Sequence, residues 1–234
     1  MKGLELSRTL YETQAQDMLK ERFPALFLRM AIGLAGEGSE CLGFDDELSQ
    51  DHDWGPGFCI WLSREDFHYY GKEVQAVYDA IPALKGIPPR QTTPQGAGRV
   101  WVLCVENWYQ RYTGVPQEPR TLSEWRAAPE SFLSVAVSGE VFYDPTGSFS
   151  AVRDRLLKFY PEDLRLKKIA ARAAVMAQAG QYNYARCLAR GERVAANLAL
   201  AEFTRAGMSM AYLLNRRYAP FYKWMHRGMK GLPV

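Results

Sequence analysis

Residues 38–53 read GSECLGFDDELSQDHD and carry the strongest signal in the chain. A Gly38–Ser39 pair is followed, after eleven residues, by Asp51-His52-Asp53. Carboxylates at positions i and i+2 of an extended strand point the same way, so Asp51 and Asp53 can share one divalent cation such as Mg²⁺. A turn of small residues lets a backbone N–H and a hydroxyl approach a phosphate. The stretch therefore predicts a site that binds a nucleoside triphosphate together with a metal ion.

Length and charge limit the classes of protein to consider. The chain has 234 residues, which corresponds to one large domain or two small ones. Its 29 basic and 26 acidic residues leave a formal net charge of only +3. This charge is too small to indicate a nucleic-acid-binding protein, and no long basic stripe is evident, so nucleic acid is not an expected partner.

The cysteines and the N-terminus indicate the expected compartment. The four cysteines are scattered without a C-x-x-C pair, which is typical of buried thiols and not of disulfides or a zinc site. The N-terminus turns polar within a few residues, unlike a signal peptide. Even the apolar stretch 25–35 is too short and too interrupted to span a bilayer. We therefore expect a cytoplasmic protein with no membrane partner.

Local patterns around the motif predict alternating helices and strands. Residues 25–35 are expected to form a buried strand that runs into Gly36–Ser39, and residues 54–62 a turn that becomes a strand. Ser63 with Asp66 three residues later predicts a helix start. Residues 99–105 form a third expected strand by their β-branched and aromatic content. Asp51 and Asp53 would then lie where the second strand begins.

The character of the chain changes near residue 119. From there to the C-terminus almost every segment has a helical period. The predicted fold class is therefore α+β, with an α/β domain over residues 1–118 that contains a small mixed sheet. An all-helical bundle domain is expected over residues 119–234.

These residues resemble a known superfamily. Gly38–Ser39, followed by Asp51-His52-Asp53 on a strand that leads to a helix, resembles the polymerase β-type nucleotidyltransferases, and the helical half is similar to that of aminoglycoside nucleotidyltransferases. The chain is closer still to a bacterial group of nucleotidyltransferase-like proteins, the DUF4037 group. Four stretches carry this last resemblance: GSECLGFDDELSQDHDWGP, GEVFYDPTGSF, YPEDLRLKKIAARAAVMAQAGQYNY and LLNRRYAPFYKW.

The resemblance implies a role for each residue of the motif. Gly38 and Ser39 would contact the nucleotide phosphates, and Asp51 and Asp53 would hold two Mg²⁺ ions. One ion would lower the pKa of the attacking hydroxyl and the other would neutralise the leaving pyrophosphate. Such a nucleotidyltransferase fold would place these residues in a cleft between the two halves.

A third carboxylate is expected in this superfamily, and here the sequence departs from the pattern. The strand 99–105 contains no acidic residue. Glu106, directly after it, is the nearest candidate for this catalytic role. Glu140, Asp144 and Glu202 are the alternatives. Without such an acid, the protein would bind nucleotides without turning them over.

Basic and polar segments of the helical half offer further contacts. A basic run at helical spacing is either a solvated face or a holder of the triphosphate tail, with Lys167 as the nucleotide-binding candidate; it comprises Arg153, Arg155, Arg165, Lys167 and Lys168. Segments 181–186 and 215–224 are rich in Tyr, Asn and Arg. They either satisfy one another in a buried polar network or line an acceptor pocket.

The sequence-based function is therefore an Mg²⁺-dependent nucleotidyltransferase. It would move a nucleoside monophosphate from a nucleoside triphosphate to a hydroxyl of a small molecule. Two alternatives remain open. One is a nucleotide-binding regulatory module without turnover, and the other is an antitoxin-like enzyme whose acceptor is a protein partner.

Overall fold

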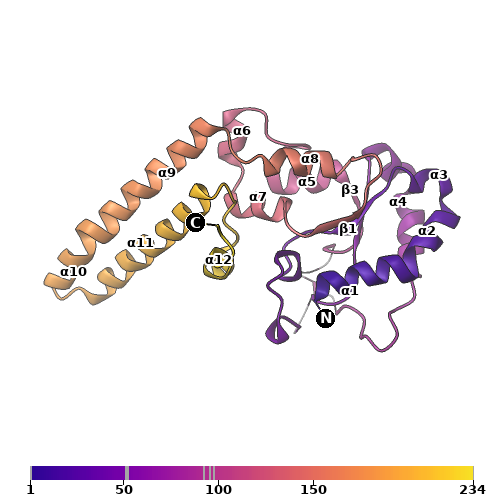
Figure 1. Ribbon diagram of the computed structural model, residues 1–234, viewed down its shortest axis with the longest axis horizontal. Helices are drawn as coiled ribbons and strands as arrows, with labels where there is room; N and C mark the ends of the chain where they lie inside the picture. The colour runs from indigo at the N-terminus through magenta and orange to yellow at the C-terminus, as the bar shows by residue number, and fades with distance from the viewer. Residues whose placement is uncertain (1, 51–52, 92, 95, 97, 234) are drawn as a thin grey trace. The chain divides into compact units, whose positions relative to one another are not determined.

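The computed structural model describes residues 2–50, 53–91, 93–94, 96 and 98–233 (Figure 1). The chain forms two compact units that are interleaved in sequence. The first, here called the α/β unit, comprises Met1–Arg120 and Val135–Leu157. The second, here called the helical unit, comprises Thr121–Ser134 and Lys158–Val234. The sequence suggested one boundary between residues 118 and 119, whereas the structure returns residues 135–157 to the first unit.

A four-stranded mixed sheet organises the α/β unit. Its strands are β1 (Ala31–Leu34), β2 (Cys59–Leu62), β3 (Val102–Cys104) and β4 (Glu140–Tyr143), in the order β3-β2-β1-β4. Strand β1 runs antiparallel to both β2 and β4, and β2 runs parallel to β3. The expected α+β class with a small mixed sheet is confirmed.

Strand β4 corrects the expectation of an all-helical second half. Its four residues, Glu140–Tyr143, pair with β1, which lies more than a hundred positions earlier in the chain. A four-residue segment shows too little periodicity to reveal a strand, and its pairing is set by a long-range partner. Gly139 marks the turn into β4, with φ of 69° and no room for a Cβ beside the Leu34 carbonyl oxygen.

The predicted strand over residues 25–35 is also shorter than expected. Pro24 begins a short helix, α3 (Pro24–Phe27), because its fixed φ suits the first helical position. Strand β1 starts only at Ala31. The helix predicted from Ser63 is confirmed as α4 (Arg64–Asp79), and the Ser63 hydroxyl accepts the Asp66 N–H as its N-cap.

Helices cover both faces of the sheet. They are α1 (Gly3–Leu10), which continues through a π-helical segment (Tyr11–Ala15) into α2 (Gln16–Arg22), and α3, α4, α5 (Val105–Thr113) and α8 (Ser150–Leu157). Because side chains alternate along β2, Ile60 and Leu62 pack in the core that contains Leu19 of α2 and Val74 of α4. Trp61 points the other way and stacks on Phe149, with ring centroids 3.9 Å apart.

The helical unit is built around a long antiparallel pair (Figure 1). Helix α9 (Glu162–Met176) continues through a π-helical segment (Ala177–Tyr184) into α10 (Ala185–Ala189). The chain then turns at Gly191 and returns as α11 (Arg193–Leu214). The remaining helices are α6 (Leu122–Ala127), α7 (Glu130–Ala136), which begins in this unit, and α12 (Tyr222–Met229). Within the described part of the chain, none of the helices combines the length and the apolar character needed to cross a bilayer.

Candidate functional site

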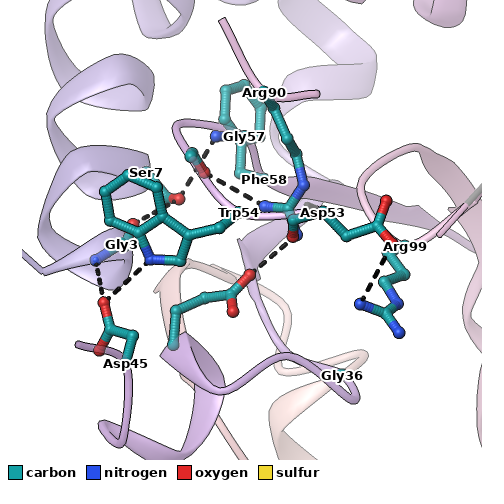
Figure 2. A network of polar contacts seen from close by, with 12 residues as sticks. Gly3, Ser7, Gly36, Asp45, Asp53, Trp54, Gly57, Phe58, Arg90 and Arg99 are labelled. Carbon is teal, nitrogen blue, oxygen red and sulfur yellow. Dashed lines mark hydrogen bonds and ion pairs between the residues drawn. The ribbon is translucent and has the colours of Figure 1, made fainter. Parts of the chain in front are cut away.

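The residues singled out around positions 38 and 53 meet at one edge of the sheet. In the antiparallel β1–β2 pair, Gly33 near the end of β1 lies opposite Cys59 at the start of β2. The segment that leaves β1 and the segment that approaches β2 therefore emerge on the same side. Gly38–Ser39 lie on the first of these segments, and Asp53 lies on the second. Figure 2 shows Gly36 of the first segment and Asp53 of the second.

The Gly38–Ser39 turn leads into a short 3₁₀ helix, η2 (Glu40–Leu42). The Gly38 carbonyl accepts the Cys41 N–H at 3.1 Å, and the Ser39 carbonyl accepts the Phe44 N–H at 2.9 Å. Ser39 is half-buried, and its hydroxyl does not cap η2. A Cβ on residue 38 would lie 2.3 Å from an oxygen of the Glu40 carboxylate. A side chain at this position would therefore displace the Glu40 carboxylate, which is held in a buried ion pair with Arg90.

Arg90 joins the two segments. Its guanidinium forms an ion pair of 2.8 Å with Glu40, and the two side chains are only 7% and 2% exposed. The same group donates to the Gly55 carbonyl at 3.2 Å and to the Asp53 carbonyl (Figure 2). A buried pair is tolerated only when further hydrogen bonds satisfy both partners. Arg90 meets that condition and fixes residues 53–55 against the Gly38 turn.

The sequence predicted that Asp53 lies on an extended strand, but the structure shows that it does not. Its φ is 51°, in the left-handed region, and β2 begins six residues later. Its buried carboxylate accepts the Thr93 N–H and the Thr93 hydroxyl, each at 2.7 Å, and lies 3.9 Å from Arg99. A Cβ on Gly96 would lie 1.9 Å from the same carboxylate. Asp53 thus anchors Gln91, Thr93 and Arg99, and Figure 2 shows its contact with Arg99.

These contacts decide whether the Asp53 carboxylate is available to bind a metal ion. Both of its oxygens already accept hydrogen bonds from Thr93, the residue is 3% exposed, and the Arg99 guanidinium supplies a positive charge beside it. In this arrangement Asp53 does not fit an Mg²⁺ site. Asp51 and His52 lie outside the described residues, so the predicted Asp51–Asp53 ligand pair has no described geometry. No cluster of three or more His, Cys, Asp or Glu side chains suited to a metal occurs among the described residues.

Asp45 belongs to the structure of this edge, although it stands in the acidic run Asp45-Asp46-Glu47. It is 2% exposed. Its carboxylate accepts the Gly3 N–H at 2.8 Å and the Trp54 indole N–H at 3.1 Å, and lies 3.5 Å from the Lys2 ammonium (Figure 2). Burial by itself would raise the pKa of Asp45, but these donors outweigh it and hold the pKa below the usual range. Asp45 therefore fastens the start of α1 to the site.

The two thiols nearest the site are poor nucleophiles. Cys41 follows the Gly38–Ser39 turn and Cys59 begins β2, and both are buried. Burial raises the pKa of the Cys41 thiol well above its ordinary value and that of Cys59 to about 12. Both groups are neutral thiols at neutral pH, which argues against thiolate chemistry here.

Glu106, the nearest candidate for the third carboxylate, lies elsewhere in the unit. It follows β3 at the start of α5, accepts the Arg64 N–H at 3.4 Å, and accepts the Cys104 thiol at 3.1 Å. Arg64 follows the end of β2, whereas Asp53 precedes its start. Since β2 and β3 are parallel, Glu106 and Asp53 lie beyond opposite ends of the strand pair. The structure does not bring them together.

The three alternative acids also have other partners. Glu140 lies at the start of β4, opposite Leu34 at the end of β1, and pairs with Arg8. Asp144 accepts the backbone N–H groups of residues 148–150, which caps the start of α8. Glu202 lies on α11 of the helical unit and pairs with Arg205 at 2.7 Å. Glu140 is the one of these acids that shares the sheet edge with the Gly38 turn.

Lys167 and the polar segments belong to the helical unit. Lys167 is exposed on α9, and the structure does not relate it to the Gly38 turn. In segment 181–186, Arg186 stacks over the exposed ring of Tyr182 at 4.6 Å. Residues 219–222 of the other polar segment line a pocket within the helical unit.

Sequence reasoning missed the residues that hold the site together. Arg90, Thr93 and Arg99 lie in or beside a Pro-, Gly- and Thr-rich stretch that reads only as a loop. Glu40 is a single acid within the motif. A run such as Pro88-Pro89-Arg90 has no periodicity from which a buried ion pair could be inferred. Only the folded chain shows which carboxylate each of these side chains meets.

Comparison with known proteins finds a match for one part of the chain. Residues 125–225 match the family model described as Domain of unknown function (DUF4037). This DUF4037 segment contains three of the four quoted stretches, and includes β4 as well as α9 and α11. It does not include the Gly38–Ser39 turn or residues 51–53. Searches of curated proteins and of solved structures gave no match.

Proposed function

We propose that the protein is a nucleotidyltransferase. It binds a nucleoside triphosphate at the sheet edge of the α/β unit and transfers a nucleoside monophosphate to a hydroxyl of a small molecule. One observation carries the proposal: the Gly38–Ser39 turn and Asp53, far apart in sequence, share this edge and are joined through Arg90. A glycine turn with nearby N–H groups suits the close approach of a phosphate.

The proposal assigns distinct roles to the residues of the motif. Gly38 and Ser39 contact the phosphates, with the half-buried Ser39 hydroxyl as a donor. Asp51 is the carboxylate that would hold Mg²⁺, which neutralises the charge of a triphosphate. Asp53 has a structural role in this site, because its carboxylate is closed by Thr93 and Arg99.

A second function, nucleotide binding without turnover, is favoured by the state of the acidic residues. Asp53 is engaged by Thr93, and Glu106 lies beyond the opposite end of the strand pair. Asp144 caps α8, and Glu140 pairs with Arg8. In this second function the Gly38 turn holds a triphosphate, and none of the acids that the structure describes activates an acceptor.

Two measurements separate these functions. Calorimetric titration with ATP, GTP, CTP and UTP, each with Mg²⁺, tests binding, and release of pyrophosphate with a panel of hydroxyl-bearing metabolites and antibiotics tests transfer. The proposed enzyme binds at least one nucleotide and releases pyrophosphate with an acceptor. Binding without release supports the second function, and absence of binding to all four nucleotides contradicts both.

Variants connect either result to the motif. Ser39→Ala should weaken nucleotide binding by about tenfold, which is the scale of one lost hydrogen bond to a charged group. Asp51→Asn should abolish transfer and the effect of Mg²⁺ on binding. Asp17→Asn, an exposed aspartate on α2, is the matched control and should behave as the unaltered protein. Binding that is unchanged in both motif variants would refute the assignment.

A further inference from the structure

The helical unit contains a pocket that the proposed function does not use. Its volume is about 280 Å³, close to the lower end of the range of roughly 300–1,000 Å³ for small-molecule sites. The walls come from helices α7, α9, α11 and α12 and from residues 219–221, which precede α12. All of the lining residues belong to the helical unit, so the pocket exists independently of the sheet edge.

One wall of the pocket is cationic. The Arg172 Nε atom donates to the buried Ser209 hydroxyl at 2.9 Å, which fixes the plane of the guanidinium. In the part of the chain that the structure describes, its two terminal nitrogens have no hydrogen-bond acceptor. Arg205 also lines the pocket, but it is largely exposed and pairs with Glu202. The Arg172 guanidinium is therefore held in one orientation, and its terminal N–H groups can donate to a planar or tetrahedral anion.

The charge balance near this wall also favours an anion. Glu130 lines the pocket and accepts the Ala219 N–H at 3.2 Å. Lys168 and Arg172 both act electrostatically on Glu130. Two cations thus share one carboxylate, while Arg205 is balanced by Glu202. A ligand with one negative charge would complete the balance.

The pocket is also lined by apolar side chains. Phe221 and Tyr222 are 54% and 69% exposed, whereas Met225 is buried and only 6% exposed. Val175 of α9 adds an aliphatic surface. A few polar groups facing an aromatic and aliphatic wall are characteristic of pockets that orient a small organic molecule.

We propose that this pocket binds a small organic anion, with its carboxylate or phosphate on Arg172 and its apolar body against Phe221, Tyr222 and Met225. Binding of such a ligand would explain why segment 215–224 is rich in polar and aromatic residues, which a helical scaffold alone does not need. The proposal concerns the helical unit alone and stands whether or not the α/β unit transfers nucleotides.

The test uses the full chain with ¹³C-labelled methionine methyl groups, and the Met225 signal is assigned from Met225→Leu. The probes are phenyl phosphate, benzoate and, as the uncharged comparison, benzyl alcohol. Phenyl phosphate or benzoate should shift the Met225 methyl signal saturably, and the stronger of the two identifies the preferred anionic group. Benzyl alcohol should bind at least about tenfold more weakly, because it lacks the charge that Arg172 recognises.

Variants of the arginine locate the anion. Arg172→Leu should weaken binding by about tenfold, whereas Arg172→Lys, which keeps the charge but loses the fork, should weaken it by about threefold. Arg193→Leu, an exposed arginine at the start of α11, is the matched control. The proposal is overturned if neither anion shifts Met225, if benzyl alcohol binds as well as the anions, or if both Arg172 variants bind like the control.

Discussion

The sheet edge of the α/β unit and the pocket of the helical unit both remove charged side chains from water, but they satisfy these charges differently. At the edge, Asp45 accepts two N–H donors, and its pKa is held low despite burial. At the pocket, Glu130 has one backbone donor, and burial raises its pKa in spite of nearby Lys168 and Arg172. A buried carboxylate that accepts enough hydrogen bonds stabilises the fold. Charged groups with fewer partners can still form hydrogen bonds or ion pairs with a ligand.

The largest expected effect concerns the arginine of each region. Arg90→Leu leaves the buried Glu40 unpaired and removes donors from two carbonyls, so the free energy of unfolding should fall by about 3–5 kcal/mol. Arg172→Leu removes one hydrogen bond to Ser209 beside an open pocket and should cost about 1–2 kcal/mol. Urea unfolding measures both.

Arg111→Leu serves as the control for this pair of substitutions. It breaks an exposed ion pair with Glu37, at side-chain exposures of 55% and 35%, and should cost less than about 1 kcal/mol. Equal losses for Arg90→Leu and Arg172→Leu would show that the edge is no more tightly closed than the pocket.

Glycine substitutions sharpen the comparison at an intermediate scale. Gly96→Ala would place a Cβ 1.9 Å from the Asp53 carboxylate, and the overpacking should destabilise the protein by about 1–3 kcal/mol. Gly207→Ala, in the middle of α11, meets only a flexible methionine side chain at 3.7 Å. It should stabilise the protein by about 0.5–1 kcal/mol, because alanine favours a helix.

Thermal unfolding measures the two alanine variants side by side. Melting temperatures that shift in opposite directions agree with the structure. A stabilised Gly96→Ala protein would mean that the carboxylate of Asp53 is not packed against residue 96.

The smallest expected effect is a difference in pH dependence. The pKa of Asp45 is lower in the folded state, so its stabilisation is complete above the unfolded value of 3.8 and is lost as the pH falls through the folded pKa. The pKa of Glu130 is raised, so its ionisation destabilises the fold above the folded pKa, and this penalty disappears below the unfolded value of 4.5.

Asparagine and glutamine variants isolate these two contributions in unfolding experiments across about pH 3 to 8. Asp45→Asn should be less stable than the unaltered protein at neutral pH, by about 1–2 kcal/mol, and the difference should shrink in acid. Glu130→Gln should be more stable at neutral pH and equal below about pH 4.5. Parallel pH profiles for the two variants would contradict the contrast between the regions.

The sequence predicted the elements that local chemistry controls. Ser63 and Asp66 predicted the start of α4, and the content of residues 99–105 predicted a strand where β3 lies. The mixed sheet and the α+β class followed from such segments. Strand β4 escaped prediction because its four residues are specified by pairing with β1, and α3 replaced part of a predicted strand after Pro24.

Some features of the candidate site were likewise indicated by the sequence, whereas others are shown only by the structure. The sequence singled out Gly38–Ser39 and Asp53 as parts of one site, and the antiparallel β1–β2 pair brings the segments that carry them to one edge of the sheet. It did not reveal that Asp53 has a left-handed backbone and is bound to Thr93, or that Asp45 is buried. These facts depend on which donors the 90–99 loop and α1 deliver, and no local pattern encodes those distances.

By itself, therefore, the sequence determined the α+β class, the start of α4 and the helical character of most of the chain after residue 119, because these depend on residues a few positions apart. The tertiary structure alone decided which carboxylates are closed, which end of the strands each acid occupies, and that Arg172 and Met225 face a common pocket. Hydrogen bonds and burial between distant segments set these outcomes, and they determine whether a charged side chain supports the fold or remains available to a ligand.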